Sequence, residues 1–466
     1  MMRRRLRLVM MILLALAAAL AAWAIVAWPR AEFVPASSRQ AWAATPANIA
    51  RGAYLARAGD CVACHTAPGG QPFAGGLPMQ TPIGTLYSTN ITPDRQTGIG
   101  DYSYADFDAA IRQGIAKEGH TLYPAMPYPS YARVSEGDMR ALYAYFMHGV
   151  TPVEQANRDS DIPWPLSMRW PLAIWRQLFA PEVVQFQPAP DQDPVVARGA
   201  YLVEGLGHCG ACHTPRAFNM QEKALSPADG KDFLAGSAPL EGWIAKNLRG
   251  DHRDGLGSWS EEQLVQFLKT GRSADSAVFG GMTEVVQHSL QYLSDADLLA
   301  IARYLKTLPA KDPHDAPFQA DGRAAAALWR GDDSARGAQV YVDNCAACHR
   351  TDGQGYDRVF PALAGNPVLR TADASSLINI VLKGGTLPGL HTAPSTIVMP
   401  PFGWRLNDAQ VADVVSFIRA SWGNDAAPVS AADVAKWRTD DNRTTSGDDL
   451  GQAFGHGQPE TREAGK

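Results

Sequence analysis

All six cysteines of this 466-residue chain belong to one kind of unit, in which two cysteines separated by two residues are followed directly by a histidine. Cysteines at this spacing lie on one face of a helical turn, so their sulfurs can bond the two vinyl groups of one porphyrin, and the adjacent imidazole can bind its iron. Three such units predict three covalently bound c-type hemes. The predicted attachment residues are Cys61, Cys64, Cys209, Cys212, Cys345 and Cys348. The predicted proximal iron ligands are His65, His213 and His349.

Other uses of cysteine do not fit this pattern. A tetrahedral zinc or iron–sulfur site generally needs four ligands, and each unit offers two thiols and one imidazole with no further cysteine nearby. A disulfide framework is typical of short, cysteine-rich chains, whereas this chain has 6 cysteines in 466 residues. A thioredoxin-like C-x-x-C pair has no need of the adjacent histidine. Covalent heme therefore remains the preferred interpretation.

The elements that must position the hemes repeat three times along the sequence. Each motif follows an Arg-Gly-Ala segment of a short helix, and each repeat ends with a helix that begins at a capping residue and carries an aromatic ten positions later. The capping residues are Ser135, Ser294 and Asn407, and the aromatics are Tyr145, Tyr304 and Phe417. We expect the first and last helices of each repeat to cross, with the glycine of the Arg-Gly-Ala segment admitting the aromatic residue.

A second axial ligand is expected between each heme motif and the closing helix of its repeat. After His349, Met399 is the one methionine of the chain, and it lies among prolines in a predicted loop. Met126 and Met282 precede their capping residues at similar distances, so the three methionines are the predicted distal ligands. The alternative is that they fill gaps in the core, which is the common role of methionine.

These repeats predict an all-α fold of three tandem domains with long loops. The expected domains are residues 48–150, 193–310 and 331–423, and the connecting segments are residues 151–192 and 311–330. Segment 151–192 is rich in Pro and Trp, and it reads either as a stiff strap packed on its own domains or as a docking surface. Residues 424–466 are polar and predict a flexible tail.

The N-terminus predicts export. Residues 8–28 are 21 uncharged, mostly apolar positions that follow four arginines, about 31 Å of helix at ~1.5 Å per residue. We expect residues 1–30 to act as a membrane anchor or a cleaved signal peptide, and the length favours the anchor. Either one places the rest of the chain on the periplasmic side of the bacterial inner membrane, where c-type hemes are attached. The net charge of −5 argues against a nucleic-acid partner.

With these motifs in hand, the chain resembles the triheme cytochrome c subunit of bacterial membrane-bound dehydrogenases over residues 48–423. Six segments carry the resemblance: Gly75–Pro78, Thr81–Gly84, Ser88–Asp94, Leu122–Tyr128, His208–Arg216 and Phe402–Leu406. The resemblance implies three tandem class I cytochrome c domains that relay electrons to ubiquinone or a terminal oxidase.

The resemblance also implies a catalytic partner subunit that oxidises an alcohol, sugar, sugar acid or aldehyde as a quinoprotein, flavoprotein or molybdoprotein, and it allows for a small third subunit. This chain has no dinucleotide-binding fingerprint of its own, so substrate oxidation is expected in the partner. Two alternatives remain open from the sequence. One is a multiheme enzyme such as a peroxidase, with one iron left open, and the other is a cytochrome subunit of a respiratory oxidase.

Overall fold

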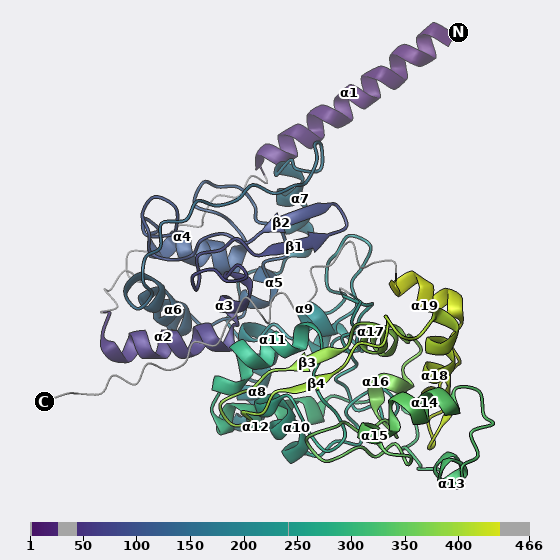
Figure 1. Cartoon of the computed structure of the whole chain (residues 1–466). Helices are drawn as coiled ribbons and strands as arrows, with labels where there is room; N and C mark the ends of the chain where they lie inside the picture. The colour runs from purple at the N-terminus through teal and green to yellow at the C-terminus, as the bar shows by residue number, and fades with distance from the viewer. Residues whose placement is uncertain (1, 27–43, 241, 439–466) are drawn as a thin grey trace, which may run out of the picture. The chain divides into compact units, whose positions relative to one another are not determined.

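The computed structural model describes residues 2–26, 44–240 and 242–438, which divide into two compact units. The first unit comprises Met1–Leu55 and Phe73–Gln187, and the second comprises Ala56–Pro72 and Pro188–Lys466. Helices dominate both units, as the sequence predicts (Figure 1). Within the described residues each unit also contains a two-stranded antiparallel hairpin, which sequence periodicity does not predict.

The first unit contains the closing helix of the first repeat and the segment that follows it. Its helices are α1 (Met2–Val26), α2 (Pro46–Ala58, of which the last three residues belong to the second unit), α4 (Tyr104–Asp108), the π-helix η2 (Ala109–Gln113), α5 (Tyr128–Tyr131), α6 (Glu136–His148) and α7 (Trp170–Phe179). Its hairpin pairs β1 (Pro78–Thr81) with β2 (Gly84–Tyr87).

The predicted membrane anchor has no support in the structure. Among the described residues, no helix combines the length and the apolar character that crossing a membrane requires. Residues 27–30 of the predicted segment lie outside the described part of the chain.

The second unit contains the second and third repeats. The helices of the second repeat are α8 (Pro194–Ala200), the π-helix η3 (Tyr201–Leu206), α9 (Gly210–His213), η4 (Pro227–Asp229), α10 (Glu261–Thr270), α11 (Gly281–His288), η5 (Leu290–Tyr292) and α12 (Asp295–Thr307). Those of the third are α13 (Arg323–Trp329), α14 (Ala338–Asn344), α15 (Ala346–His349), α16 (Pro367–Arg370), α17 (Ser375–Lys383), α18 (Asp408–Ala420) and α19 (Ala431–Arg438). Its hairpin pairs β3 (Gly385–Leu387) with β4 (Ile397–Met399).

Residues 56–72, which carry the first heme motif as helix α3 (Cys61–Cys64), group with the second unit. Helix α3 lies against α11 of that unit, and Arg57 adds side-chain contacts. Its Nη1 atom donates a hydrogen bond to the His288 carbonyl oxygen at 3.3 Å, and its guanidinium lies 4.4 Å from the centre of the Tyr292 ring. The compact units therefore do not coincide with the three domains that the repeats predict.

In each repeat the first and last helices meet at a glycine, as the sequence predicts. The three pairs of glycine and aromatic residue are Gly52 and Tyr145, Gly199 and Tyr304, and Gly337 and Phe417. A Cβ atom at any of these glycines would lie within 3.0 Å of the aromatic Cβ atom. The closing helices α6, α12 and α18 begin at the predicted caps, whose side chains accept hydrogen bonds from the third residue of the helix.

The arginine before each crossing glycine makes an ion pair with the closing helix, which the sequence analysis did not anticipate. The pairs are Arg51 with Asp138, Arg198 with Asp297, and Arg336 with Asp413. In the third repeat Gln410 occupies the position of the other two aspartates, and its side chain accepts a hydrogen bond from the Asn407 amide at 3.0 Å. Arg336 therefore pairs with a carboxylate one turn further along α18.

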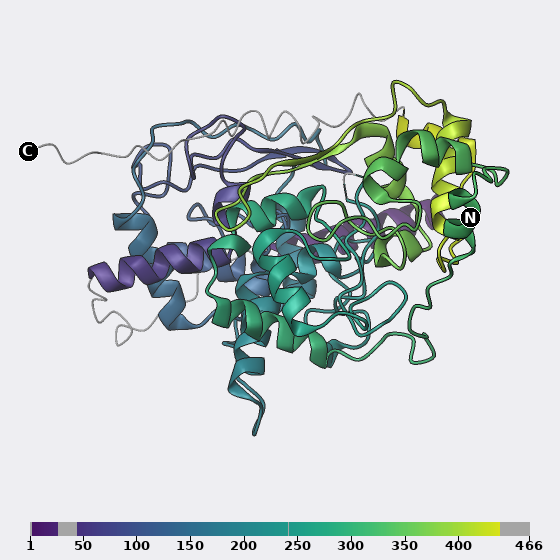
Figure 2. The same cartoon turned by 60° about the horizontal axis from the view of Figure 1, so that its bottom comes forward.

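Two apolar clusters of the described residues contribute to the packing of the second unit. The larger one is the core of the third repeat, where α18 packs against both α14 and α19 (Figure 1). The smaller one consists of Val278, Val286, Leu387 and Leu390, and it joins α11 to the β3–β4 hairpin. Because these side chains come from the second and third repeats, the two repeats share buried apolar surface. Figure 2 shows the same backbone turned by 60°.

The predicted flexible tail is wrong for its first part. Residues 431–438 form α19, and the Val434 side chain at its centre is fully buried against the core of the third repeat. Burying this side chain and its neighbours offsets the entropy that ordering a short helix costs. Residues 439–466 of the predicted tail lie outside the described part of the chain.

Candidate heme-binding sites

The three heme motifs share one backbone hydrogen bond. Each forms a single helical turn in which the histidine amide donates a hydrogen bond to the carbonyl oxygen of the first cysteine. The donor–acceptor distances are 3.0 Å for His65 to Cys61, 3.0 Å for His213 to Cys209 and 2.9 Å for His349 to Cys345. This turn is the local geometry that places both sulfurs and the imidazole for one porphyrin.

Two of the proximal histidines are oriented by a backbone carbonyl. His213 Nδ1 donates to the Lys246 carbonyl oxygen at 2.7 Å, and His349 Nδ1 donates to the Pro361 carbonyl oxygen at 3.0 Å. Burial lowers the pKa of His213 to about 4 and lowers that of His349, so both rings are neutral at physiological pH. A neutral ring that donates through Nδ1 presents the lone pair of Nε2, which is the state that an iron ligand requires.

All six cysteines are free, as attachment of a porphyrin through their sulfurs requires. Burial raises the pKa of Cys61, Cys209 and Cys345 to about 12, so these thiols stay protonated, and none of the six cysteines forms a disulfide. In the part of the chain that the structure describes, no three His, Cys, Asp or Glu side chains converge on a metal-ion site. The residues present therefore fit heme c, and a zinc site finds no support in them.

Met126 lies in a turn of the first unit, directly before α5. Its amide donates to the Tyr123 carbonyl oxygen at 3.1 Å, and its own carbonyl accepts from the Tyr128 amide at 2.8 Å. The hydroxyls of Tyr123 and Tyr128 are buried without a hydrogen-bond partner in the described residues. Buried orphan hydroxyls are rare, and they are consistent with a polar ligand group next to this turn. The distal role of Met126 stays a prediction.

Met282 and Met399 occupy regular elements. Met282 lies in the first turn of α11 and packs against the cluster of Val278, Val286, Leu387 and Leu390, which is the contact expected of a core methionine. Met399 ends strand β4 opposite Gly385, so the loop predicted at this position is wrong, because main-chain pairing with β3 extends the segment. Ligation by either methionine stays a prediction.

Three asparagines form a feature that the sequence analysis missed. In each case the side-chain carbonyl accepts a hydrogen bond from the amide two residues later, at 2.9 Å for Asn90, 2.9 Å for Asn247 and 3.1 Å for Asn366. Asn247 directly follows Lys246, whose carbonyl orients His213. The number of residues between each asparagine and its heme motif differs from repeat to repeat, so a constant spacing in the sequence does not identify these asparagines.

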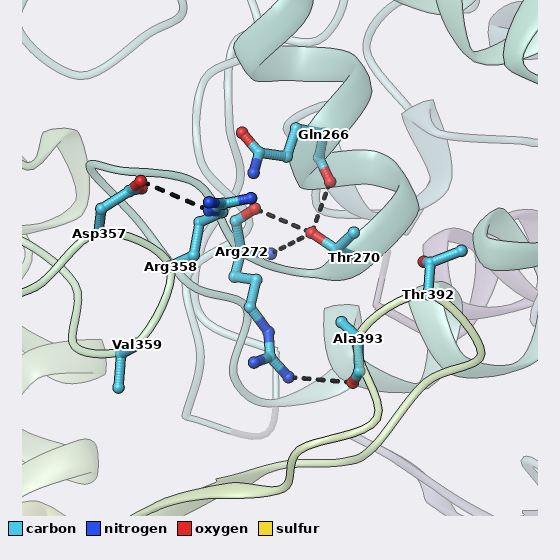
Figure 3. Close-up of a pocket in the computed structure, with 8 residues that line it drawn as sticks. All are labelled: Gln266, Thr270, Arg272, Asp357, Arg358, Val359, Thr392 and Ala393. Carbon is cyan, nitrogen blue, oxygen red and sulfur yellow. Dashed lines mark hydrogen bonds and ion pairs between the residues drawn. The ribbon is translucent and has the colours of Figure 1, made fainter.

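A cavity of about 300 Å³ in the second unit is separate from these residues (Figure 3). It is lined by Gln266, Thr270, Arg272, Asp357, Arg358, Val359, Thr392 and Ala393, none of which is a predicted heme residue. The Arg272 guanidinium donates to the Ser395 carbonyl oxygen at 2.8 Å, while its Nε atom has no partner in the described residues. The cavity lies between α10, residues 357–359 and the loop after β3, and its lining is of mixed polarity.

Glu222 gives the second motif a pH-dependent contribution to stability. Its carboxylate packs against Gly210, and burial raises its pKa from about 4.5 to about 7, an effect that Arg216 opposes. The folded state therefore holds a proton that the unfolded chain releases, so stability falls as the pH rises through 7. Between pH 5 and 8 we expect the wild-type unfolding free energy to fall by about 2 kcal/mol more than that of Glu222→Gln. Denaturant titrations of both proteins measure this difference, and parallel curves would contradict it.

The motif turns and the carbonyl-oriented histidines are features of a c-type cytochrome. The chain matches the family model described as Cytochrome c over residues 49–149 and 334–422, so the region between them, with the second motif, is not matched. Heme c is thus its covalently bound cofactor.

The relatives define the family more narrowly. The chain is 68% identical over 401 residues to the gluconate 2-dehydrogenase cytochrome c subunit of Pantoea cypripedii, covering 85% of this chain and 91% of the relative. It is 55% identical over 397 residues to the cytochrome c subunit of the quinone alcohol dehydrogenase of Gluconobacter oxydans (85% and 83%), and 39% identical over 411 residues to the fructose dehydrogenase cytochrome subunit of Gluconobacter japonicus (84% and 82%). The chain belongs to the family of dehydrogenase cytochrome c subunits, and it transfers electrons from a catalytic subunit.

Proposed function

We propose that this chain is the triheme cytochrome subunit of a membrane-bound dehydrogenase on the periplasmic side of the bacterial inner membrane. The observation that carries the proposal is the 68% identity to a gluconate dehydrogenase subunit over 91% of that relative, combined with three motif turns that share the same backbone hydrogen bond. In this proposal each of the three repeats is a class I cytochrome c domain. This includes the second repeat, although the family model does not match it.

The residues of each motif have distinct roles in the proposed mechanism. The cysteines would hold each heme by thioether bonds, and the histidine with Met126, Met282 or Met399 would ligate its iron. The bound groups supply one-electron redox centres, and a thioether ligand favours their reduced state relative to a second imidazole. In His213 and His349 the Nδ1–H group donates a hydrogen bond to a backbone carbonyl oxygen, so neither ring needs to exchange a proton during turnover. Electrons would leave the chain to ubiquinone or a terminal oxidase.

Sugar acids are the donor class with the strongest support. The relative with 68% identity is a subunit of gluconate 2-dehydrogenase, whereas a subunit of quinone alcohol dehydrogenase is 55% identical. We infer that the catalytic partner oxidises gluconate. The test is detergent extraction of the complex, identification of the large subunit that copurifies, and a panel of gluconate, ethanol, fructose and an aldehyde while heme absorbance is followed. Reduction by gluconate first supports the proposal, and reduction by ethanol alone would assign the chain to the alcohol group.

The number of hemes is tested independently of the donor. Intact mass and heme absorbance should give three hemes per chain for the wild type and two for a variant with Cys345→Ser and Cys348→Ser. A wild-type chain with two hemes would contradict the proposal that all three motifs are loaded.

A further inference from the structure

Helix α19 lies beyond the three repeats but is built into the third one. Val434 is fully buried, and Trp437 packs against the same apolar core. The segment that leads to α19 is also fixed, because the Val429 amide donates to Ser416 Oγ in α18 at 2.8 Å. The position of the last described residue, Arg438, is therefore set by the packing of Val434 and Trp437 and by the fixed segment before the helix.

Arg438 uses its guanidinium to hold the chain that follows Met399. Nη1 donates to the Gly403 carbonyl oxygen at 2.5 Å, Nη2 donates to the Leu406 carbonyl oxygen at 2.8 Å, and Nε donates to Asp408 at 2.5 Å. The planar fork of arginine matches this arrangement, whereas the point charge of lysine cannot reach three acceptors in this geometry. Charge-assisted hydrogen bonds of this kind are stronger than neutral ones.

The same segment is tied on its other side to the end of α17. The Phe402 and Gly403 amides donate to the Val381 and Leu382 carbonyl oxygens at 2.9 and 3.0 Å. A Cβ atom at Gly403 would lie 2.7 Å from the Leu382 carbonyl oxygen and 3.4 Å from Arg438 Nη1, so the turn is closely enclosed. The chain from Phe402 to the start of α18, three residues after Met399, is thus held on one side by α17 and on the other by Arg438.

We propose that Arg438 is a positioning residue for Met399: α19 acts as a brace that keeps the predicted distal ligand of the third heme in place. This inference rests on the proposed ligation by Met399. Without the guanidinium, the carbonyls of Gly403 and Leu406 would lose their bonds to α19, and the turn after Met399 would gain freedom. A freer methionine ligand competes less well for iron against an added ligand.

The first unit contains an independent arrangement of the same kind. Arg169, at the start of α7, places its guanidinium 4.1 Å from the centre of the Tyr123 ring, and Trp175 of α7 packs edge-on against Tyr128 at 6.4 Å. Tyr123 and Tyr128 flank Met126. In this unit too, a helix that follows the closing helix of its repeat contacts the turn of a predicted methionine ligand.

The test measures the bond between Met399 and iron in the full heme-loaded chain. In Arg438→Ala we expect a weaker far-red charge-transfer band in the ferric protein, a lower midpoint potential for one heme, and about tenfold tighter binding of added imidazole to one heme per chain. Arg438→Lys should give a smaller increase, because lysine retains the charge but not the fork. Lys436→Ala, on the same helix and bonded to Asp433, is the matched control and should behave as the wild type.

Met399→Ala distinguishes failure of the proposed ligation by Met399 from failure of the proposed positioning role of Arg438. If Met399→Ala loses the band and binds imidazole while Arg438→Ala matches the wild type, the brace is refuted and ligation stands. If Met399→Ala keeps the wild-type band and affinity, ligation fails and the brace fails with it. Should Arg438→Ala not accumulate, Asp408→Ala, which removes the acceptor of Arg438 Nε and leaves its other two bonds, must still tighten imidazole binding. An unchanged affinity in that variant would overturn the proposal.

Discussion

Replacing Met399 with alanine will leave the third heme attached but open its iron to carbon monoxide. The attachment rests on Cys345, Cys348 and His349, whose turn is independent of strand β4. Loss of the thioether should also lower the midpoint potential of that heme by on the order of 0.1 V or more, since axial ligands spread heme potentials over about 0.8 V. Carbon monoxide difference spectra and a redox titration of the reduced, untreated protein measure both effects.

Two variants sharpen this prediction. Met399→His supplies a second imidazole, so it should remain inert to carbon monoxide while its potential still falls. Met282→Leu tests whether Met282 of α11 is an iron ligand or a core residue. If Met282 is a ligand, the variant will bind carbon monoxide at the heme of the second repeat. If Met282 is a core residue, none of the three hemes of the variant will bind carbon monoxide. A Met399→Ala protein that does not bind carbon monoxide would contradict the assignment of the third distal ligand.

Gly52→Ala should destabilise the first unit by about 3 kcal/mol, or lower its thermal midpoint by roughly 10 °C. The added Cβ atom would overlap the Ala141 carbonyl oxygen and lie 2.6 Å from Tyr145 Cβ, so α2 and α6 would have to separate. Separation also strains the ion pair between Arg51 and Asp138. Scanning calorimetry of the heme-loaded chain measures the shift.

Gly137→Ala is the matched control for this helix pair. Gly137 lies in the first turn of α6 and has no atom within 4 Å of its Cβ position. Alanine there should be neutral or stabilise by up to ~1 kcal/mol, because it is the better helix former. Equal midpoints for Gly52→Ala and Gly137→Ala would show that the crossing glycine is not required for packing.

The features that the sequence predicts well are those with strong local signals. Ser135, Ser294 and Asn407 begin the closing helices because a capping side chain satisfies free amides wherever it occurs. Gly52, Gly199 and Gly337 mark the crossings because glycine alone allows two backbones to approach so closely. The motif turns are predicted equally well, because each turn is formed by five consecutive residues.

The features that it misses depend on distant contacts. Strands β3 and β4 are three residues long, too short for alternation to show. Helix α19 has one fully buried side chain, Val434, so it lacks the apolar stripe that predicts a packed helix. Residues 56–72 group with the second unit because α3 lies against α11, a contact between distant parts of the sequence that composition cannot reveal.

The central claim is that this chain carries electrons which another subunit removes from the substrate. The most direct measurement mixes gluconate with the detergent-extracted complex and, in parallel, with the isolated heme-loaded chain, and follows heme reduction in both. We expect reduction of all three hemes in the complex and none in the isolated chain. Heme reduction in the isolated chain would make it an enzyme in its own right, and a complex whose hemes stay oxidised with every donor of the panel would contradict the account.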